Sequence, residues 1–256
     1  MAQLNFKIIG DPDAKEIVLV FLHDAIGSVS QWRNFPESVC NKLSLPGIVY
    51  DRKGHGKSPS LEGIRNVDYM HRYAWEELPE FINQTAPDKK LILIGHSDGG
   101  SIALLFAAKF PEKTLGIITM AAHVLVEEIT LNGIRETAKK FETGEWMEKL
   151  RKHHGENTKT IFEAWWKTWT SPEFKDWNIR EHLANITCPV FAIQGVDDNY
   201  GTEDQVDRIL YAIEAYGEKW MIDESCGHAP WKSHSEELID RINTFIIDRV
   251  LPVGYQ

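Results

Sequence analysis

Residues 91–106 read LILIGHSDGGSIALLF: four apolar residues, a glycine-rich turn and a longer, mostly apolar segment. The spacing predicts a buried strand, then a G-x-S-x-G turn centred on Ser97, then a helix. Small residues at Gly95 and Gly99 allow the strand and the helix to approach closely around a strained serine. We therefore expect the Ser97 hydroxyl to stand at the carboxyl edge of a sheet, where the amide of Asp98 at the helix N-terminus faces an anion developing on a substrate.

Outward from this turn, short runs rich in β-branched residues alternate with longer segments of helical spacing. Such alternation predicts an α/β fold in which a mostly parallel sheet is flanked by helices. The last helix is expected where apolar residues recur at three- and four-residue steps over 238–246, with Ser233 and Glu236 as a capping box at its start. The expected strands are residues 6–9, 17–22, 48–50, 91–94, 115–119, 190–194 and 219–222.

The alternation is interrupted over residues 123–186, which hold much charge, five of the nine tryptophans and no strand-like run. We interpret this segment as a helical cap, or lid, inserted between two strands of a core formed by residues 1–122 and 187–256. An aromatic stripe within it either packs the cap on itself or roofs an apolar substrate pocket, and both interpretations stay open. The stripe has helical spacing and consists of Phe162, Trp165, Trp166 and Trp169.

A serine hydroxyl needs a base to become a nucleophile, and histidine exchanges protons near neutral pH. Of the ten histidines, His228 lies in a loop between the last expected strand and the last expected helix, at the sheet edge where Ser97 should stand. We therefore predict His228 as the base. His23 and His96 are expected near the same edge, but each flanks a turn and fits a structural or supporting role better.

The imidazole in turn needs a carboxylate that holds its tautomer and stabilises its charged form. After the expected strand 190–194 the chain reads Gly195-Val196-Asp197-Asp198, which is another loop at the same edge. Such a loop should send one of two adjacent side chains inward. We expect Asp198 rather than Asp197, which gives the chain order serine, aspartate, histidine.

Together these motifs resemble the α/β-hydrolase superfamily, in the group with a helical cap, over nearly the full length of the chain. The loop DRKGHGKS at residues 51–58 is similar to the D-x-R-G-x-G-x-S loop of that family. The resemblance implies a carboxylesterase-like serine hydrolase with Ser97, Asp198 and His228 as catalytic residues and no cofactor. A serine at the turn disfavours haloalkane dehalogenases and epoxide hydrolases, which place an aspartate there.

The resemblance also implies an oxyanion hole made of two backbone amides. One is that of Asp98, after the serine. In relatives the second comes from the loop after His23, which usually reads H-G-x; here Asp24 replaces the glycine and Ala25 follows. The amides of Asp24 and Ala25 are therefore both candidates, and we favour Ala25.

A tryptophan-rich cap favours small to medium apolar or aryl esters, hydrolysed through an acyl-enzyme on Ser97. A lactonase, a carbon–carbon-bond hydrolase of aromatic degradation and a ligand receptor built on the same scaffold stay open as alternatives. The candidate substrate contacts are Trp165, Trp166, Trp169, His123 and Trp231.

Composition disfavours several other classes of protein. With 28 Lys and Arg against 38 Asp and Glu, the formal charge of −10 argues against nucleic acid and acidic membranes as partners. The three cysteines lack the spacing of a disulfide framework or a zinc site, and no histidine pair has the spacing of a catalytic metal site. Apolar runs reach only six residues and the start of the chain has no signal pattern, so we expect a cytoplasmic protein without a metal ion.

Overall fold

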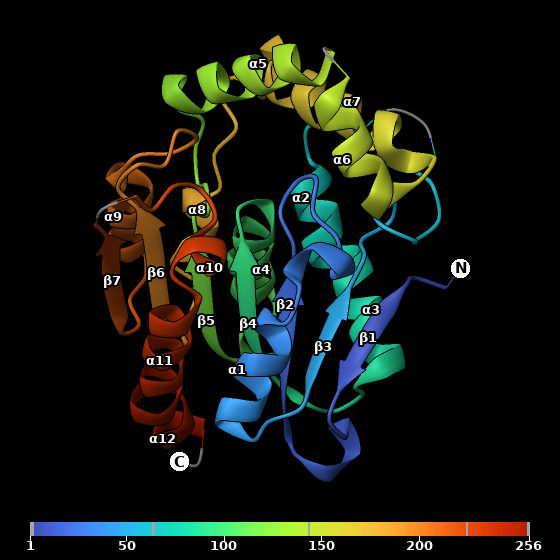
Figure 1. Ribbon diagram of the computed structural model, residues 1–256. Helices are drawn as coiled ribbons and strands as arrows, with labels where there is room; N and C mark the ends of the chain where they lie inside the picture. The colour runs from blue at the N-terminus through green and yellow to red at the C-terminus, as the bar shows by residue number, and fades with distance from the viewer. Residues whose placement is uncertain (1–2, 63–64, 143, 224, 255–256) are drawn as a thin grey trace.

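The computed structural model describes residues 3–62, 65–142, 144–223 and 225–254. Its strands are β1 (Phe6–Ile9), β2 (Ile17–Leu22), β3 (Gly47–Tyr50), β4 (Lys90–His96), β5 (Thr114–Met120), β6 (Val190–Gly195) and β7 (Gly217–Ile222). They form one sheet in the order β1-β3-β2-β4-β5-β6-β7 (Figure 1), in which only β1 runs antiparallel to its neighbour. Every run expected to be a strand is one, and the mostly parallel sheet is confirmed.

Both faces of this sheet are buried, which explains why the central strands are almost wholly apolar. Successive side chains of a strand point to opposite faces. In β2, Val18 and Val20 belong to one hydrophobic core, whereas Leu19 and Phe21 belong to the other. The sheet is therefore the middle of three layers.

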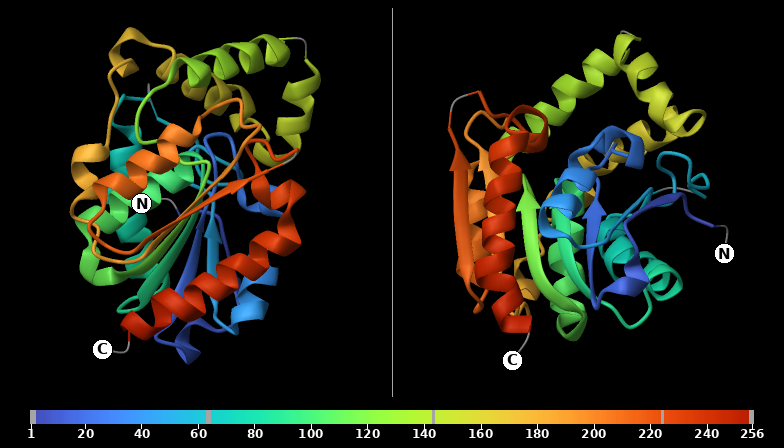
Figure 2. Two further views of the ribbon diagram at one scale, coloured as in Figure 1. Left: turned by 90° about the vertical axis from the view of Figure 1, so that its left-hand side faces the viewer. Right: turned by 60° about the horizontal axis from the view of Figure 1, so that its bottom comes forward.

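Helices form the two outer layers (Figure 2). The face of Leu19 and Phe21 is covered by α1 (Phe35–Leu43) and α11 (Ser235–Phe245). The opposite face is covered by α3 (Leu78–Thr85), α4 (Asp98–Lys109) and α9 (Glu203–Ala212). Helices on both faces flank the sheet as the alternating sequence pattern predicts.

The segment between β5 and β6 is helical, with α5 (Glu128–Glu142), α6 (Glu145–His154), α7 (Asn157–Trp169) and α8 (Arg180–Leu183). Figure 1 shows α5, α6 and α7 above the arrowheads of the parallel strands, over the edge at which β4, β5 and β6 end. The division of the chain into a core of residues 1–122 and 187–256 and a cap of residues 123–186 stays a prediction.

The expected capping box of the last long helix is wrong. Pro230 starts a separate helical turn, α10 (Pro230–Ser233), so Ser233 ends that turn instead of preceding α11. The N-cap of α11 is His234, whose side chain makes no capping hydrogen bond. The apolar stripe of α11 is as expected, because Leu238, Ile242 and Phe245 are buried. The remaining α-helices of the described residues are α2 (Tyr69–Arg72) and α12 (Leu251–Gly254), and π-helical segments at Tyr73–Glu77 and Ile246–Val250 continue α2 and α11.

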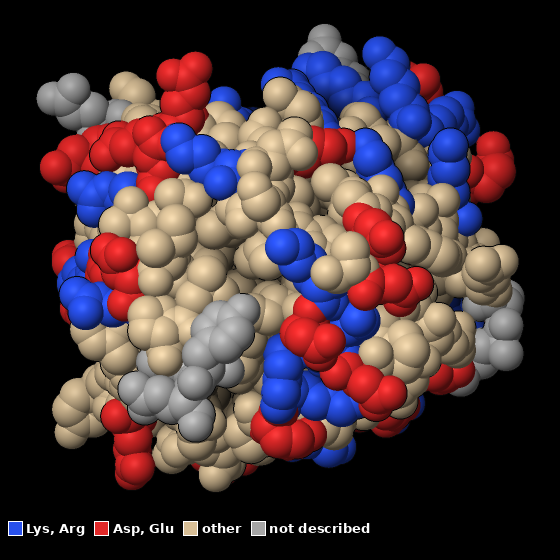
Figure 3. Space-filling model, turned by 90° about the horizontal axis from the view of Figure 1, so that it is seen from below, with Lys and Arg blue, Asp and Glu red and all other residues tan. Residues whose placement is uncertain are grey.

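The end of the molecule opposite α5–α7 carries acidic, basic and uncharged side chains side by side (Figure 3). Within the described residues, no helix combines the length and the apolar character that crossing a lipid bilayer demands.

Candidate active site

Ser97 occupies a one-residue turn between β4 and α4. Its φ of 53° and ψ of −122° lie in a region that residues with a side chain rarely adopt, so the backbone is strained there. A methyl group on Gly95 would lie 2.3 Å from the carbonyl oxygen of Gly99, and one on Gly99 would lie 2.0 Å from that of Leu22. Both distances are far below van der Waals contact, which explains the need for glycine on each side of the serine.

The structure brings Ser97, His228 and Asp198 into one hydrogen-bonded array. Ser97 Oγ lies 2.9 Å from Nε2 of His228, and Nδ1 of the same ring lies 2.9 Å from each carboxylate oxygen of Asp198. The three residues follow β4, β7 and β6, which end at the same edge of the sheet. Parallel strands thus gather residues that are up to 131 positions apart in the chain.

Asp198, and not Asp197, meets the imidazole. The Asp198 carboxylate is buried and accepts further hydrogen bonds from the Tyr200 amide at 2.8 Å and from Nε2 of Gln194 at 3.2 Å. Asp197 is exposed, and its side chain accepts from the Ser225 amide at 3.1 Å. Of these two neighbours, Asp198 is therefore the one whose side chain points inward to His228.

The charges of the array stabilise each other. Burial disfavours the charged imidazolium, but attraction to Asp198 outweighs this effect and raises the pKa of His228. Burial likewise opposes the carboxylate of Asp198, yet the nearby His228 lowers its pKa overall. This is the electrostatic arrangement that a serine-activating base requires, because the proton taken from the hydroxyl is stabilised on the ring.

His96 and His23 act as structural supports beside the array. Nε2 of His96 lies 2.6 Å from the carbonyl oxygen of His228, and its Nδ1 lies 3.3 Å from Oδ2 of Asp24. Burial would raise the pKa of Asp24, but the hydrogen bond with His96 holds that pKa far below its usual range. Nδ1 of His23 lies 2.8 Å from the Asp24 carbonyl oxygen. These contacts fix the loops on either side of Ser97.

The loop after β2 turns its carbonyl groups away from solvent. Arg52 donates to the carbonyl oxygens of His23 at 2.5 Å and Asp24 at 2.7 Å. Because N–H and C=O of a trans peptide point in opposite directions, the amides of Asp24 and Ala25 face away from Arg52. The amide of Asp98 is the first of α4 and has no acceptor within the helix. These are the amides available for an oxyanion.

Two of the predicted substrate contacts lie beside the array. The ring of His123, just after β5, is 5.9 Å from that of His228, and its Nε2 lies 2.9 Å from the Tyr200 carbonyl oxygen. The ring of Trp169 is 5.3 Å from that of His123. The ring of Tyr200 lies 4.7 Å from that of His228, and no sequence pattern had pointed to this neighbour.

The other three predicted contacts lie further out. The ring of Trp165 packs 6.3 Å from that of Tyr200. Trp166 is half-buried on α7, and the Nζ of Lys167 lies 5.8 Å from its ring. Trp231 is buried 5.1 Å from the ring of Trp32, in the core on the α1 and α11 side of the sheet. The Trp231 ring also packs against that of His96, so Trp231 lies behind the array, within the hydrophobic core.

A buried hydrogen-bond chain joins α7 to the residue that follows Ser97. Nε1 of Trp169 donates to the Tyr69 hydroxyl at 2.9 Å, and that hydroxyl donates to Oδ2 of Asp98 at 2.6 Å. The three residues come from α7, α2 and α4. No spacing in the sequence connects them, so their contact could not be predicted.

No group of three or more histidine, cysteine, aspartate or glutamate side chains with a geometry suited to a metal ion occurs in the part of the chain that the structure describes.

The chain matches the model of the α/β hydrolase fold family over residues 17–164. It is 25% identical to the proline iminopeptidase of Saccharolobus solfataricus, over 89% of this chain and 84% of that protein. It is 28% identical to the pimeloyl-[acyl-carrier protein] methyl ester esterase of Wigglesworthia glossinidia brevipalpis, over 91% of this chain and 94% of that protein. The crystal structure of the enol-lactonase from Burkholderia xenovorans LB400 has the same fold, with a TM-score of 0.73 at 15% identity, over 96% of this chain and 97% of that one. The chain therefore belongs to the α/β hydrolase fold family, as the motif around Ser97 predicts.

Proposed function

We propose that this protein hydrolyses carboxylic esters of small to medium apolar or aryl substrates through an acyl-enzyme on Ser97. The observation that carries the proposal is the pair of distances at His228, whose two ring nitrogens lie 2.9 Å from the Ser97 hydroxyl and 2.9 Å from the Asp198 carboxylate. A serine placed in this way has both the base that removes its proton and the anion that stabilises the charged base.

In the acylation step, Nε2 of His228 takes the Ser97 proton while Oγ attacks the ester carbonyl carbon. The electron pair of the carbonyl moves to oxygen, and the resulting oxyanion accepts hydrogen bonds from the amides of Asp98 and Ala25. Collapse of this intermediate breaks the bond to the alcohol oxygen. His228 returns its proton to that oxygen, and the alcohol leaves.

In the deacylation step, His228 takes a proton from water, and the hydroxide attacks the acyl-enzyme carbonyl. The second tetrahedral intermediate uses the same two amides. Its collapse releases the carboxylic acid and returns the proton to Ser97 Oγ. Asp198 holds the imidazole in the required tautomer through both steps, and it stays unprotonated.

Two observations support an apolar ester as the substrate. Aromatic side chains near the array, those of Trp169, Trp165 and Tyr200, offer apolar surface for an acyl or aryl group. Of the two relatives compared above by sequence identity, the one that matches over the larger share of both lengths is a methyl ester esterase. The relative described as a proline iminopeptidase favours a second candidate, hydrolysis of an N-terminal prolyl amide by the same serine.

Steady-state hydrolysis of a p-nitrophenyl ester series tests the proposal and separates the two candidates. We expect turnover of the acetate and butyrate esters and little turnover of prolyl p-nitroanilide. Ser97→Ala should lower kcat by on the order of 10³-fold or more, because the array acts as a unit. Ser60→Ala changes an exposed serine and serves as the matched control. Faster turnover of the prolyl anilide than of any ester would replace the ester proposal by the peptidase one.

We also propose a cytoplasmic location. Cys40, Cys188 and Cys226 are free and buried, which suits a reducing compartment. Burial raises the pKa of Cys40 and of Cys188 to about 12, so these thiols have little thiolate at neutral pH. Fractionation of the source cells followed by immunodetection tests this location, and recovery outside the cytoplasm would contradict it.

A further inference from the structure

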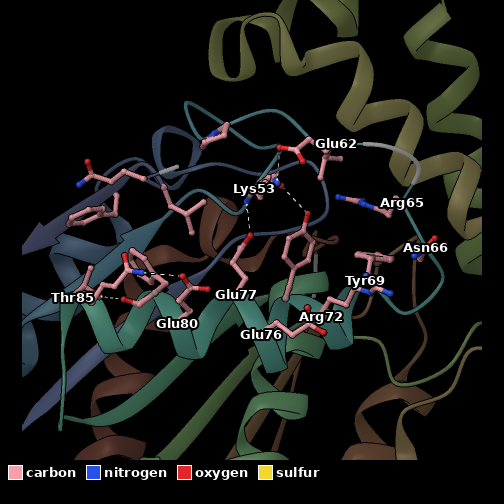
Figure 4. A pocket seen from close by; sticks show the side chains of 18 residues that line it. Lys53, Glu62, Arg65, Asn66, Tyr69, Arg72, Glu76, Glu77, Glu80 and Thr85 are labelled. Carbon is pink, nitrogen blue, oxygen red and sulfur yellow. Dashed lines mark hydrogen bonds and ion pairs between the residues drawn. The ribbon is translucent and has the colours of Figure 1, made fainter. Parts of the chain in front are cut away.

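A cavity of about 820 Å³ lies away from the hydrogen-bonded array: its lining does not include Ser97, His228 or Asp198. It lies beside β1, between the loop that follows β3 and the helical stretch from α2 to α3 (Figure 4). Aromatic rings supply much of its wall, namely those of Phe6, Tyr69, Tyr73 and Phe81. A space of this size with apolar walls suits a small organic molecule.

Arg65 places an unpaired positive charge in this cavity. All three guanidinium nitrogens are buried, and none of them makes a hydrogen bond with the residues that the structure describes. The guanidinium lies over the ring of Tyr69, 4.4 Å from its centroid. The other basic residues of the lining have acidic partners: Lys53 pairs with Glu62 at 3.3 Å, and Arg72 pairs with Asp68 at 2.9 Å.

A buried guanidinium without an acceptor is unusual, because arginine is almost never buried unless it is paired. Burial opposes the charge of Arg65, but attraction to Tyr73, Tyr69 and Asp98 outweighs it and raises the pKa of Arg65. Stacking on Tyr69 and the contact with Tyr73 offset part of the lost hydration, but no carboxylate among the described residues forms an ion pair with the guanidinium. A hydrogen-bond acceptor on a bound molecule would supply the partner that the Arg65 guanidinium lacks.

The remaining charges of the cavity restrict which anion fits. Four glutamates also line it, Glu62, Glu76, Glu77 and Glu80, so a dianion such as phosphate meets strong repulsion. A carboxylate carries one negative charge, and its two oxygens match the planar fork of a guanidinium. Oε1 of Glu77 is buried and makes no hydrogen bond with any described residue, so it is available to a hydroxyl or amide donor on the same molecule.

We propose that this cavity is a second binding site, for a small molecule that carries one carboxylate group on an aromatic or other apolar body, with the carboxylate on Arg65. The site is separate from the chemistry at Ser97 and does not depend on the ester hydrolysis proposed above. The two sites are neighbours through Tyr69, whose ring supports Arg65 and whose hydroxyl donates to Asp98.

Isothermal titration calorimetry on the Ser97→Ala variant tests the proposal without interference from turnover. The probes are benzoate, 3-phenylpropionate and octanoate, each compared with its primary amide, and inorganic phosphate. We expect at least one carboxylate to bind with millimolar or better affinity, and to bind about tenfold or more tightly than its amide and than phosphate. No binding by any of the three carboxylates, or equal binding of acid and amide, would overturn the proposal.

Two matched arginine substitutions locate the bound carboxylate. Arg65→Gln should weaken carboxylate binding about tenfold or more, whereas Arg72→Gln, at the partnered arginine of the same cavity, should change it less than about twofold. Circular dichroism melts establish whether both variants fold. If Arg65→Gln does not fold, the comparison of acid with amide in the protein with an unchanged cavity decides whether a carboxylate binds there. Equal effects of the two substitutions would show that Arg65 does not hold the carboxylate.

Discussion

The hydroxyl of Tyr69 is the link between α7 and the residue that follows Ser97, and its removal gives a defined test of the packing. Tyr69→Phe deletes one oxygen and leaves the ring in place. That oxygen donates to Oδ2 of Asp98 at 2.6 Å and accepts from Nε1 of Trp169 at 2.9 Å. Asp98 is 1% exposed and Trp169 is 2% exposed, so water has no ready access to replace either bond.

The expected cost follows from these two partners. A hydrogen bond to a charged group contributes about 1.5–3 kcal/mol, and a buried donor left without an acceptor costs about 1–3 kcal/mol. We therefore expect Tyr69→Phe to lower the free energy of unfolding by roughly 3 kcal/mol or more. Tyr73→Phe serves for comparison: its hydroxyl donates to a neutral acceptor, the carbonyl oxygen of Lys53 at 2.9 Å, and interacts with Arg65, and we expect its removal to cost less than that of the Tyr69 hydroxyl, about 1 kcal/mol.

Urea unfolding at pH 7, followed by far-ultraviolet circular dichroism, measures both variants. A double-mutant cycle with Trp169→Phe isolates the bond between the two side chains, because the second substitution removes a donor that has already lost its acceptor. The double variant should be more stable than the sum of the single changes predicts, by about 1 kcal/mol. A Tyr69→Phe cost no larger than that of Tyr73→Phe, together with additive single changes, would refute this reasoning.

Three further predictions address the base, the turn and the cavity. In the proposed mechanism the neutral form of His228 is the base, so kcat/KM should rise with pH through a pKa above the ordinary histidine value. Asp198→Asn should remove the attraction that raises this pKa, move the acidic limb to lower pH and lower kcat by on the order of 10⁴-fold, whereas Asp197→Asn should leave the pH profile unchanged. Gly99→Ala places a methyl group 2.0 Å from the Leu22 carbonyl oxygen, so it should abolish folding or lower the free energy of unfolding in urea by about 3 kcal/mol or more. In the control Gly227→Ala the new methyl group meets no atom closer than 3.7 Å, and the loss should be about 1 kcal/mol or less. Burial raises the pKa of Glu77 from 4.5 to about 7, so between these pH values the folded protein holds a proton that the unfolded chain releases. The free energy of unfolding should therefore fall by up to about 3 kcal/mol as the pH rises from 4.5 to 7, and Glu77→Gln should remove that part of the pH dependence.

The fold was predictable because the strands are buried on both faces. Residues 91–94 are all apolar, so this run does not show the spaced apolar residues of an amphipathic helix. Gly95 and Gly99 are each needed because a side chain there would collide with a neighbouring backbone carbonyl oxygen. The proximity of Ser97, Asp198 and His228 was predictable for a related reason. Each lies in the segment that follows a strand of the parallel part of the sheet, so its position in the sequence fixes the edge at which it lies.

Contacts between helices had no such signal in the sequence. The chain from Trp169 through Tyr69 to Asp98 joins α7, α2 and α4, whose relative placement follows from packing and not from any spacing. The unpaired charge of Arg65 is likewise a property of its surroundings, because it depends on which neighbours fail to reach it.

The aromatic stripe of α7 shows why two interpretations of it stayed open. Phe162 stacks on Phe141 of α5 with ring centroids 3.6 Å apart, which is packing among the helices between β5 and β6. Trp169 instead contacts His123, beside His228. The two ends of one helix face therefore have different surroundings: Phe162 packs on α5, whereas Trp169, seven positions later, lies near the site.

Mass spectrometry after treatment with a fluorophosphonate shows whether Ser97 is an activated nucleophile, because that reagent bonds covalently to activated serines. We expect one stoichiometric adduct on the tryptic peptide that contains Ser97, lost in Ser97→Ala and strongly slowed in His228→Ala. An unmodified Ser97 in the folded wild-type protein, or equal labelling of the His228→Ala variant, would contradict it.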